Sequence, residues 1–442
     1  MLVKIGKHEL GRVKMSAFAL KYDELGYKKR TRIGLLVAAV ATMMVLGTVY
    51  SWSVYKIPLM KSHGWSPPQV SLAFSFSILF LGISASVGGR FIDRTSAGTV
   101  AKIAAVLFGG GTLLAGLADQ TGSLWLLWLG YGIIAGIGNG LAYLVPVAVL
   151  VRWFPDKKGT VTGFAVMGFG LGAAVSGQVA PLLIEKIGVA RTFYGAGLLF
   201  FAVLFIASFW LKNPARVCFI DPKAPKAAES IDLSKALGMN QFYLLWAAMF
   251  LNILAGIALI GNLSPLAQHQ LAITPVTAGS IIFAVSVCNG VGRLLAGWVS
   301  ERIGRSRTFV LLLLTQIPCF LLLGHIHNIW MFTGVCCYIM LCYGGGFGTM
   351  PSFAADTFGT GHIGKIYGVI LLAWGLAGGI GPLLIEYGRD KWGSFTQPLY
   401  MAAIGLGIGA LAVMLYKKPD LRVDRGCAEG GQTLGRRQVK VK

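Results

Sequence analysis

Charged residues are scarce in this sequence, and acidic residues are the scarcest. Asp, Glu, Lys and Arg make up 13% of the 442 residues against 55% hydrophobic residues, and only 17 acids stand beside 39 bases. A soluble protein of this composition would expose large apolar patches, so the composition excludes the water-soluble globular class. We expect the chain to fold in a lipid bilayer.

Patterns that carry catalytic or metal chemistry are missing as well. The seven cysteines lack ligand spacing, and the sequence has neither an H-E-x-x-H motif nor a Ser/His/Asp set. We therefore expect no disulfide, no metal site, no cofactor and no enzymatic activity. The glycine runs at 136–140 and 168–172 follow no strand, which favours close packing of membrane helices over a phosphate loop.

Long apolar stretches are abundant. A helix needs about 20 residues to cross the bilayer core. The 32 polar and basic residues that precede the first stretch argue against a cleavable signal peptide. The stretches predict an all-α membrane protein with 12 transmembrane helices, at approximately 33–58, 69–89, 100–118, 124–151, 160–184, 192–211, 240–263, 276–300, 307–324, 329–355, 365–387 and 398–416.

Basic residues follow the loops in alternation. The arm 1–32 holds nine of them, the central loop 212–239 five and the tail 417–442 eight, and with the other even-numbered loops one side of the membrane collects 32 of the 39. The positive-inside rule then predicts that both termini and the central loop are cytoplasmic, in a cell (inner) membrane. Because the charge follows the topology, the expected partner is the lipid bilayer and not a nucleic acid.

Two pairs of segments repeat between the first and second parts of the chain. Residues 89–94 (GRFIDR) resemble residues 297–302 (GWVSER), and residues 181–185 and 382–386 both read Pro-Leu-Leu-Ile-Glu. An internal duplication of this kind determines the architecture. It predicts two six-helix halves on either side of the central loop, at 33–211 and 240–416.

This plan resembles the major facilitator superfamily over essentially the whole chain, with halves related by an axis along the membrane normal. The repeated G-x-x-x-D/E-R pattern implies a gating role for Asp93, Arg94, Glu301 and Arg302. The acid and the arginine would latch the cytoplasmic ends of neighbouring helices, and release of the latch would let the halves rock. The alternative is a solvated turn whose ion pair contributes under about 1 kcal/mol.

A single arginine lies inside an apolar stretch. Residues 278–300 contain Arg293 and no other charge. A guanidinium in the bilayer core costs roughly 2.5 to 3.5 kcal/mol, so it should face a partner, a water-filled cavity or an anion. The alternative is an arginine that snorkels toward the headgroups near Glu301. We expect no second deep cation, and Asp356 as the one acid in a span region, so the cavity should suit a small anion with a single carboxylate.

A narrower resemblance connects the chain to the oxalate:formate antiporter family, which lies close to the monocarboxylate transporters. It rests on residues 49–52 (VYSW), 152–159 (RWFPDKKG) and 289–293 (NGVGR). The resemblance implies that Arg293 binds the carboxylate. It further implies tyrosines of the binding site in the fourth and first helices and aromatic cavity residues in the tenth, namely Tyr143, Tyr50, Tyr343 and Phe347.

Two positions depart from the patterns of these families. The oxalate carrier has a lysine in its eleventh helix where this chain has Trp374, so an oxalate dianion would lose an ion pair and a monoanion such as lactate, pyruvate, glycolate or formate is expected. Animal-type monocarboxylate carriers have an aspartate four residues before the arginine, where this chain has Asn289. Their proton-coupling scheme therefore does not transfer directly.

Together these features predict a secondary active transporter of small organic monocarboxylates that works as a monomer by alternating access. Proton symport is the expected coupling, because an anion that moves inward against a negative interior requires a compensating cation. An oxalate:formate-type anion exchanger is the alternative, and a sensor on a transporter scaffold is the remote one. The expected substrate-binding residues are Arg293, Tyr50, Tyr143, Tyr343, Asn289, Phe347 and Trp374.

Overall fold

The computed structural model describes residues 29–154, 158–212, 231–359 and 363–419, and the regular structure of these ranges is helical. Twelve helices within them are long and apolar enough to cross a membrane, so the predicted all-α class is confirmed. The first half contains α2 (Lys29–Gly47), η1 (Thr48–Ser51), α3 (Ser53–His63), α4 (Pro67–Arg94), α5 (Ala97–Thr121), α6 (Leu124–Leu127), η2 (Trp128–Ile134), α7 (Ala135–Trp153), α8 (Lys158–Ile187) and α9 (Val189–Ser208).

The second half repeats this helical plan. Its elements are α10 (Leu233–Ala236), α11 (Asn240–Leu271), α12 (Pro275–Ile303), α13 (Arg305–Leu323), α14 (Ile329–Phe358), α15 (Ile363–Ile370), α16 (Leu372–Trp392) and α17 (Thr396–Met414).

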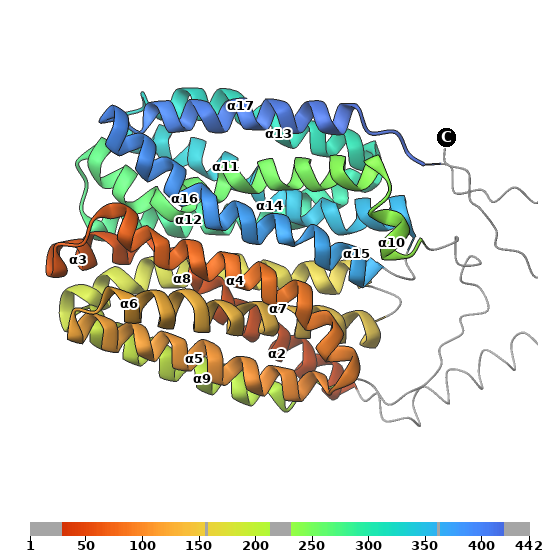
Figure 1. Ribbon diagram of the computed structural model, residues 1–442, viewed down its shortest axis with the longest axis horizontal. Helices are drawn as coiled ribbons and strands as arrows, with labels where there is room; N and C mark the ends of the chain where they lie inside the picture. The colour runs from red at the N-terminus through yellow and green to blue at the C-terminus, as the bar shows by residue number, and fades with distance from the viewer. Residues whose placement is uncertain (1–28, 155–157, 213–230, 360–362, 420–442) are drawn as a thin grey trace, which may run out of the picture.

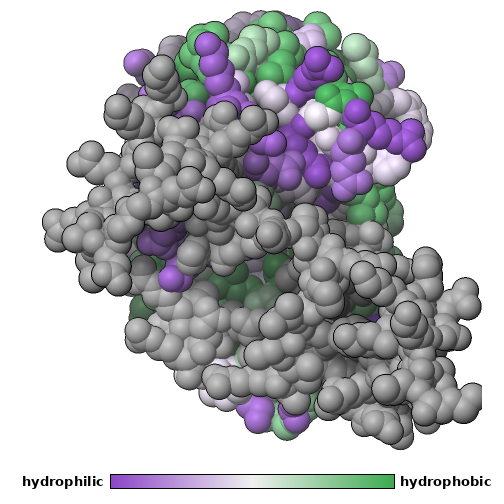
Figure 2. All heavy atoms as spheres, turned by 90° about the vertical axis from the view of Figure 1, so that its right-hand side faces the viewer, coloured by the Kyte–Doolittle hydropathy of each residue, from purple (hydrophilic) through white to green (hydrophobic). Residues whose placement is uncertain are grey.

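The two halves form two layers of roughly parallel helices (Figure 1). Helices α2 to α9 make the lower layer in that view, and α11 to α17 make the upper one. We call the end of the bundle where α2 begins and α17 stops the terminal end, and the end at α3 the distal end. At the terminal end, hydrophilic side chains gather on the upper layer (Figure 2).

Short, well-capped connections define the distal end. Helices stop there at Gly64 and Gly122, whose φ angles of 67° and 66° are left-handed and favour glycine. New helices start at Thr274, whose side chain accepts a hydrogen bond from Thr277 N, and at Asn328, which caps α14. These connections hold the distal ends of the spans in register.

The halves meet along α4 with α16 and along α8 with α12. Glycine permits backbone contact at both seams: a Cβ at Gly82 would lie 2.5 Å from Gly375 Cα, and one at Gly170 would lie 2.9 Å from Gly290 N. Small residues let membrane helices approach this closely. The backbones of the two halves therefore pack directly against each other at these seams.

Two spans are interrupted near the centre of the bundle. The first span changes to a tighter 3-10 turn at η1 before α3 continues to His63, and the eleventh is broken at Leu371 between α15 and α16. The sequence predicts both as single stretches. Interruptions of this kind change the direction in which side chains leave the helix, and here they carry Tyr50 in η1 and Trp374 in the first turn of α16.

Candidate functional site

Arg293 is buried between the two halves, with 3% of its surface exposed. Its Nε donates a hydrogen bond to Oδ1 of Asn289, 3.2 Å away and one turn earlier in α12. Its Cζ lies 4.8 Å from the ring centre of Phe347 and 5.6 Å from that of Phe169. The guanidinium is thus held by one amide and two aromatic faces.

The outer nitrogens of Arg293, Nη1 and Nη2, have no hydrogen-bond partner. Within the described ranges, Arg293 also takes part in no ion pair. Enclosure by protein argues against the snorkelling alternative, which would direct the charge to the surface. A buried guanidinium whose two terminal nitrogens are free is a ready site for one carboxylate, because the fork matches its two oxygens.

Tyrosines from both halves meet beside this arginine. The hydroxyl of Tyr50 in η1 lies 2.7 Å from the hydroxyl of Tyr343 in α14, in a buried hydrogen bond that crosses the half interface. Tyr343 in turn packs edge-on against Phe347, with ring centres 5.4 Å apart. The two phenols therefore satisfy each other and lie within the same cluster as the guanidinium.

Trp374 is the centre of the aromatic cluster. It is fully buried, and its ring centre lies 5.1 Å from Phe347, 5.4 Å from Tyr143 and 6.4 Å from Tyr50. Its indole Nε1 has no hydrogen-bond partner. An unpaired indole N–H is a second donor, besides Arg293, that a polar ligand could occupy.

The structure brings all seven predicted substrate-binding residues into this one cluster. It adds Phe169 of α8, whose ring contacts Tyr50 at 5.0 Å, Tyr143 at 6.0 Å and Trp374 at 5.9 Å. The sequence analysis missed Phe169 because it lies in the glycine run 168–172, which we interpreted only as a packing surface. The one feature of the sequence that could have indicated Phe169 is that it is a large aromatic residue between two glycines.

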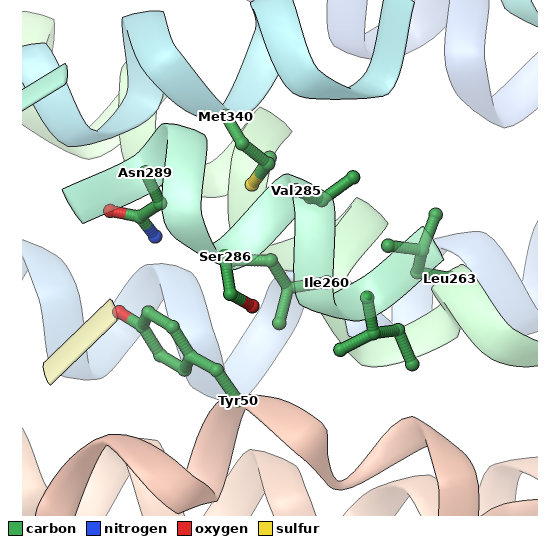
Figure 3. A pocket seen from close by; sticks show the side chains of 8 residues that line it. Tyr50, Ile260, Leu263, Val285, Ser286, Asn289 and Met340 are labelled. Atoms are coloured by element: carbon green, nitrogen blue, oxygen red, sulfur yellow. The ribbon is translucent and has the colours of Figure 1, made fainter. Parts of the chain in front are cut away.

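A small cavity of about 10 Å³ adjoins Tyr50. Figure 3 shows the Tyr50 ring on one side and, across from it, the polar side chains of Asn289 and Ser286 on α12. This volume accommodates about one water molecule. The centre of the protein is therefore closed around its polar groups, and an anion can enter only if the surrounding rings move apart.

The predicted gating residues lie at the terminal end. The side chains of Asp93 and Arg94 fall outside the described residues. Glu301 is exposed and forms no ion pair with another described residue, while the Arg302 guanidinium lies 3.8 Å from the centre of the Trp298 ring.

Arg305, three residues further on, makes the observed link at this end. Its Nε lies 3.2 Å from Oδ2 of Asp356 at the end of α14, and its Nη1 donates to Ser300 Oγ in α12. Arg305 therefore connects the terminal ends of α12 and α14, a contact that the repeated motif does not predict.

A second buried cation contradicts the sequence-based expectation. Lys56 of α3 is 1% exposed and forms an ion pair with Glu386 of α16, which is fully buried, and its Nζ also donates to Asn262 Oδ1 at 2.5 Å. The expectation that Asp356 is the one acid in a span region is wrong for the same reason. Lys56 lies within the predicted first span, 33–58, but we counted it with the basic residues on the side of the membrane opposite the termini and not as a buried cation.

The chain is similar to known transporters over most of its length. It is 29% identical over 355 residues to the uncharacterized MFS-type transporter YhjX of Escherichia coli (strain K12), covering 79% of this chain and 86% of that one. It is 27% identical over 365 residues to the oxalate:formate antiporter of Oxalobacter formigenes, covering 78% and 83%. The apicoplast pyruvate carrier 1 of Toxoplasma gondii is 24% identical over 447 residues, with 78% and 81% covered.

A solved structure has the same fold. The inward-facing, unoccupied crystal structure of a bacterial homolog of the human lysosomal transporter Spinster superposes with a TM-score of 0.70 at 16% identity, covering 88% of this chain and 97% of that one. The predicted resemblance and the prediction of a transporter in place of an enzyme are confirmed by these relatives and by the family model, which matches residues 33–382 and 245–436. This chain belongs to the Major Facilitator Superfamily.

Proposed function

We propose that this protein is a secondary active transporter of small organic monocarboxylates, of the lactate, pyruvate and formate class, that works by alternating access. The observation that carries the proposal is the buried Arg293, whose Nη1 and Nη2 lack partners at the interface between the halves. A cation in this position needs an anion to compensate its charge. The antiporter and pyruvate carrier among the relatives transport small carboxylates by their names, which supports the same class here.

A single carboxylate fits the charges better than two. Lys56 is the other buried cation of the described chain, and it is already paired with Glu386 and Asn262. Arg293 is then the one uncompensated charge of the cluster, and its fork matches one carboxylate. The rings of Trp374 and Phe347, which pack edge-on with their centres 5.1 Å apart, give the cluster an apolar wall, which favours a monoanion with an apolar body over oxalate.

Movement of the two halves would expose this site alternately to each side of the membrane. The glycine seams of α4 with α16 and α8 with α12 permit such rocking. We place the basic terminal end in the cytoplasm of the cell membrane by the positive-inside rule. Contacts at this end, with Asp93, Arg94, Glu301 and Arg302 as the latch of the repeated motif, would hold it closed.

Proton symport is the coupling that we propose, because it makes the uptake of a monoanion electroneutral. Anion exchange is the second candidate. It is favoured by one observation, the similarity to the oxalate:formate antiporter. The two differ in whether transport requires an anion on the opposite side of the membrane.

Counterflow in proteoliposomes tests the proposed substrate class. Vesicles that contain the purified protein and unlabelled lactate, pyruvate or formate should accumulate the labelled acid, and Arg293→Ala should abolish this exchange. Arg191→Ala is the matched control, since Arg191 is exposed at the distal end. Absence of counterflow with every short monocarboxylate, or an unchanged affinity in Arg293→Ala, would overturn the assignment.

A further inference from the structure

A buried ion pair joins the two halves at the distal end. Lys56 belongs to α3 in the first half, whereas its partners Glu386 and Asn262 belong to α16 and α11 in the second. Asn262 is itself fixed to the backbone, because its Nδ2 donates to Pro382 O at 3.2 Å and to Ala258 O at 3.0 Å. Any separation of the halves at this end must pull Lys56 away from both partners.

The neighbouring charged groups show that Glu386 is the acid that pairs with Lys56 across the interface between the halves. On its own helix, Arg389 Nη2 lies 3.5 Å from Glu386 Oε2 and is shared with Asp390 at 3.2 Å. From α3, Lys61 faces the same region as Lys56, and from α11 His269 does. Glu386 is therefore the acid that meets the cations of α3, and Asp390 contacts Arg389 instead.

A cavity on the distal side borders the ion pair. It has a volume of about 380 Å³ and is lined by Lys56, Glu386, Arg389, Lys61, His269 and Gln268, among others. The Glu386 carboxylate has no exposed surface, but it lies beside a space large enough for several water molecules. A proton can be exchanged between that water and Glu386 without passage through the centre of the protein.

The internal repeat supplies a comparison for this acid. The first half has the same Pro-Leu-Leu-Ile-Glu segment at 181–185, but there Glu185 is exposed. The identical local sequence shows that the helix itself does not bury the acid. Contact with Lys56 across the interface is what distinguishes Glu386 from its counterpart.

We propose that Glu386 is a protonation site that controls the distal opening: its carboxylate holds the halves together through Lys56, and protonation releases them. The proton comes from water in the distal cavity and returns to it when the ion pair forms again, so no other reactant is needed. Neutral Glu386 loses its attraction for the Lys56 ammonium, while Arg389 keeps its partner Asp390. The inference concerns the conformation of the protein and does not depend on which anion is carried.

Distance measurements between spin labels test this inference without a substrate. Trp125 in the first half and Trp330 in the second lie near the distal end and are 77% and 82% exposed. Both would be replaced by labelled cysteines in a variant free of the native cysteines. The labels should give a single shorter distance at alkaline pH, and a longer distance should become populated on acidification.

Variants assign the response to this acid. Glu386→Gln and Lys56→Met should both show the longer distance at every pH, because either change removes the ion pair that holds the distal ends together. Glu185→Gln and His269→Gln should retain the response of the parent. A pH-independent distance in the parent, a parent-like response in Glu386→Gln, or loss of the response in His269→Gln would overturn the proposal. The pH dependence of the label distance in the parent protein can overturn the proposal even where a variant fails to fold.

Discussion

At the scale of single residues, the main feature of the candidate site is that the two outer nitrogens of Arg293 have no hydrogen-bond partner. Its Nε is bound to Asn289 while Nη1 and Nη2 remain free, so the side chain is oriented by the protein and open toward a ligand. The rings of Phe347 and Phe169 offset part of the cost of burying the charge. This arrangement is the one that we expect of an arginine that binds an anion.

Replacement of Arg293 by lysine tests the geometry of the fork. Arg293→Lys keeps the charge but loses the planar pair of donors, so at most weak substrate binding should remain. Loss of a buried charged hydrogen-bond partner costs on the order of 2 to 5 kcal/mol, and the dissociation constant should rise accordingly. Calorimetric titration with a short monocarboxylate measures the change, and affinity equal to the parent would show that Arg293 is no carboxylate ligand.

We expect Trp374 to determine whether the site prefers an acid with one carboxylate or an acid with two. Trp374→Lys introduces a second cation within the cluster, so oxalate binding should improve relative to lactate or formate. Competition by unlabelled acids for counterflow gives the ratio. Should oxalate already bind the parent more tightly than any monocarboxylate, the single-cation argument is wrong; Trp125→Lys, at an exposed tryptophan, is the control.

Much of this cluster could be predicted from the sequence, because a lone charge in an apolar stretch and short family motifs are local signals. The pair of Lys56 and Glu386 could not, since its members lie 330 positions apart and each is found near the end of an apolar stretch. Phe169 was missed for a related reason: nothing in a glycine run indicates which direction its ring will face. The sequence therefore does not predict which side chains contact each other across the interface between the two halves.

At the scale of helices, two interruptions position the cluster. Because η1 tightens the first span and Leu371 interrupts the eleventh, Tyr50 reaches the interface from a 3-10 turn and Trp374 from the first turn of α16. The number and order of the spans followed from hydropathy alone. The breaks did not, because an apolar composition is compatible with both a straight and an interrupted helix.

The seam between α4 and α16 should tolerate no added side-chain volume. Gly82→Ala places a Cβ against the backbone of Gly375, and overpacking of this kind costs typically about 1 to 3 kcal/mol. Both the melting temperature in detergent and the rate of counterflow should fall. Gly110→Ala is the control, because a Cβ there meets no atom within 4 Å; equal behaviour of the two variants would refute a tight seam.

At the scale of the whole molecule, two similar halves enclose one central site with different contacts at their two ends. Arg305 and Asp356 link helices of the second half at the terminal end, whereas Lys56 and Glu386 link the two halves at the distal end. The internal duplication predicted the architecture of the halves. It did not predict this asymmetry, because Glu386 is buried against Lys56 whereas Glu185, in the same repeated segment, is exposed.

The coupling of anion transport to a proton or to a second anion is a property of the complete transport cycle. The charge moved in each cycle determines how transport should respond to pH and to voltage. Symport of a monocarboxylate with one proton is electroneutral, so uptake should rise when the outside is acidified and should not respond to an imposed membrane potential. Substrate-dependent alkalinisation outside proteoliposomes without internal anion is the measurement. Intact transport without alkalinisation, or with an absolute requirement for an internal anion, would identify an exchanger; protein-free vesicles control for passive diffusion of the acid.

The hydrogen bond between the Tyr50 and Tyr343 hydroxyls engages both phenols at the proposed site. An arriving anion that engages these phenols must first break a contact between them, so its affinity is the difference between two sets of hydrogen bonds. Release of the anion is favoured by the same amount, because the two tyrosines form their hydrogen bond again when the anion leaves. We therefore expect a carrier with this site to bind its anion weakly and to release it rapidly.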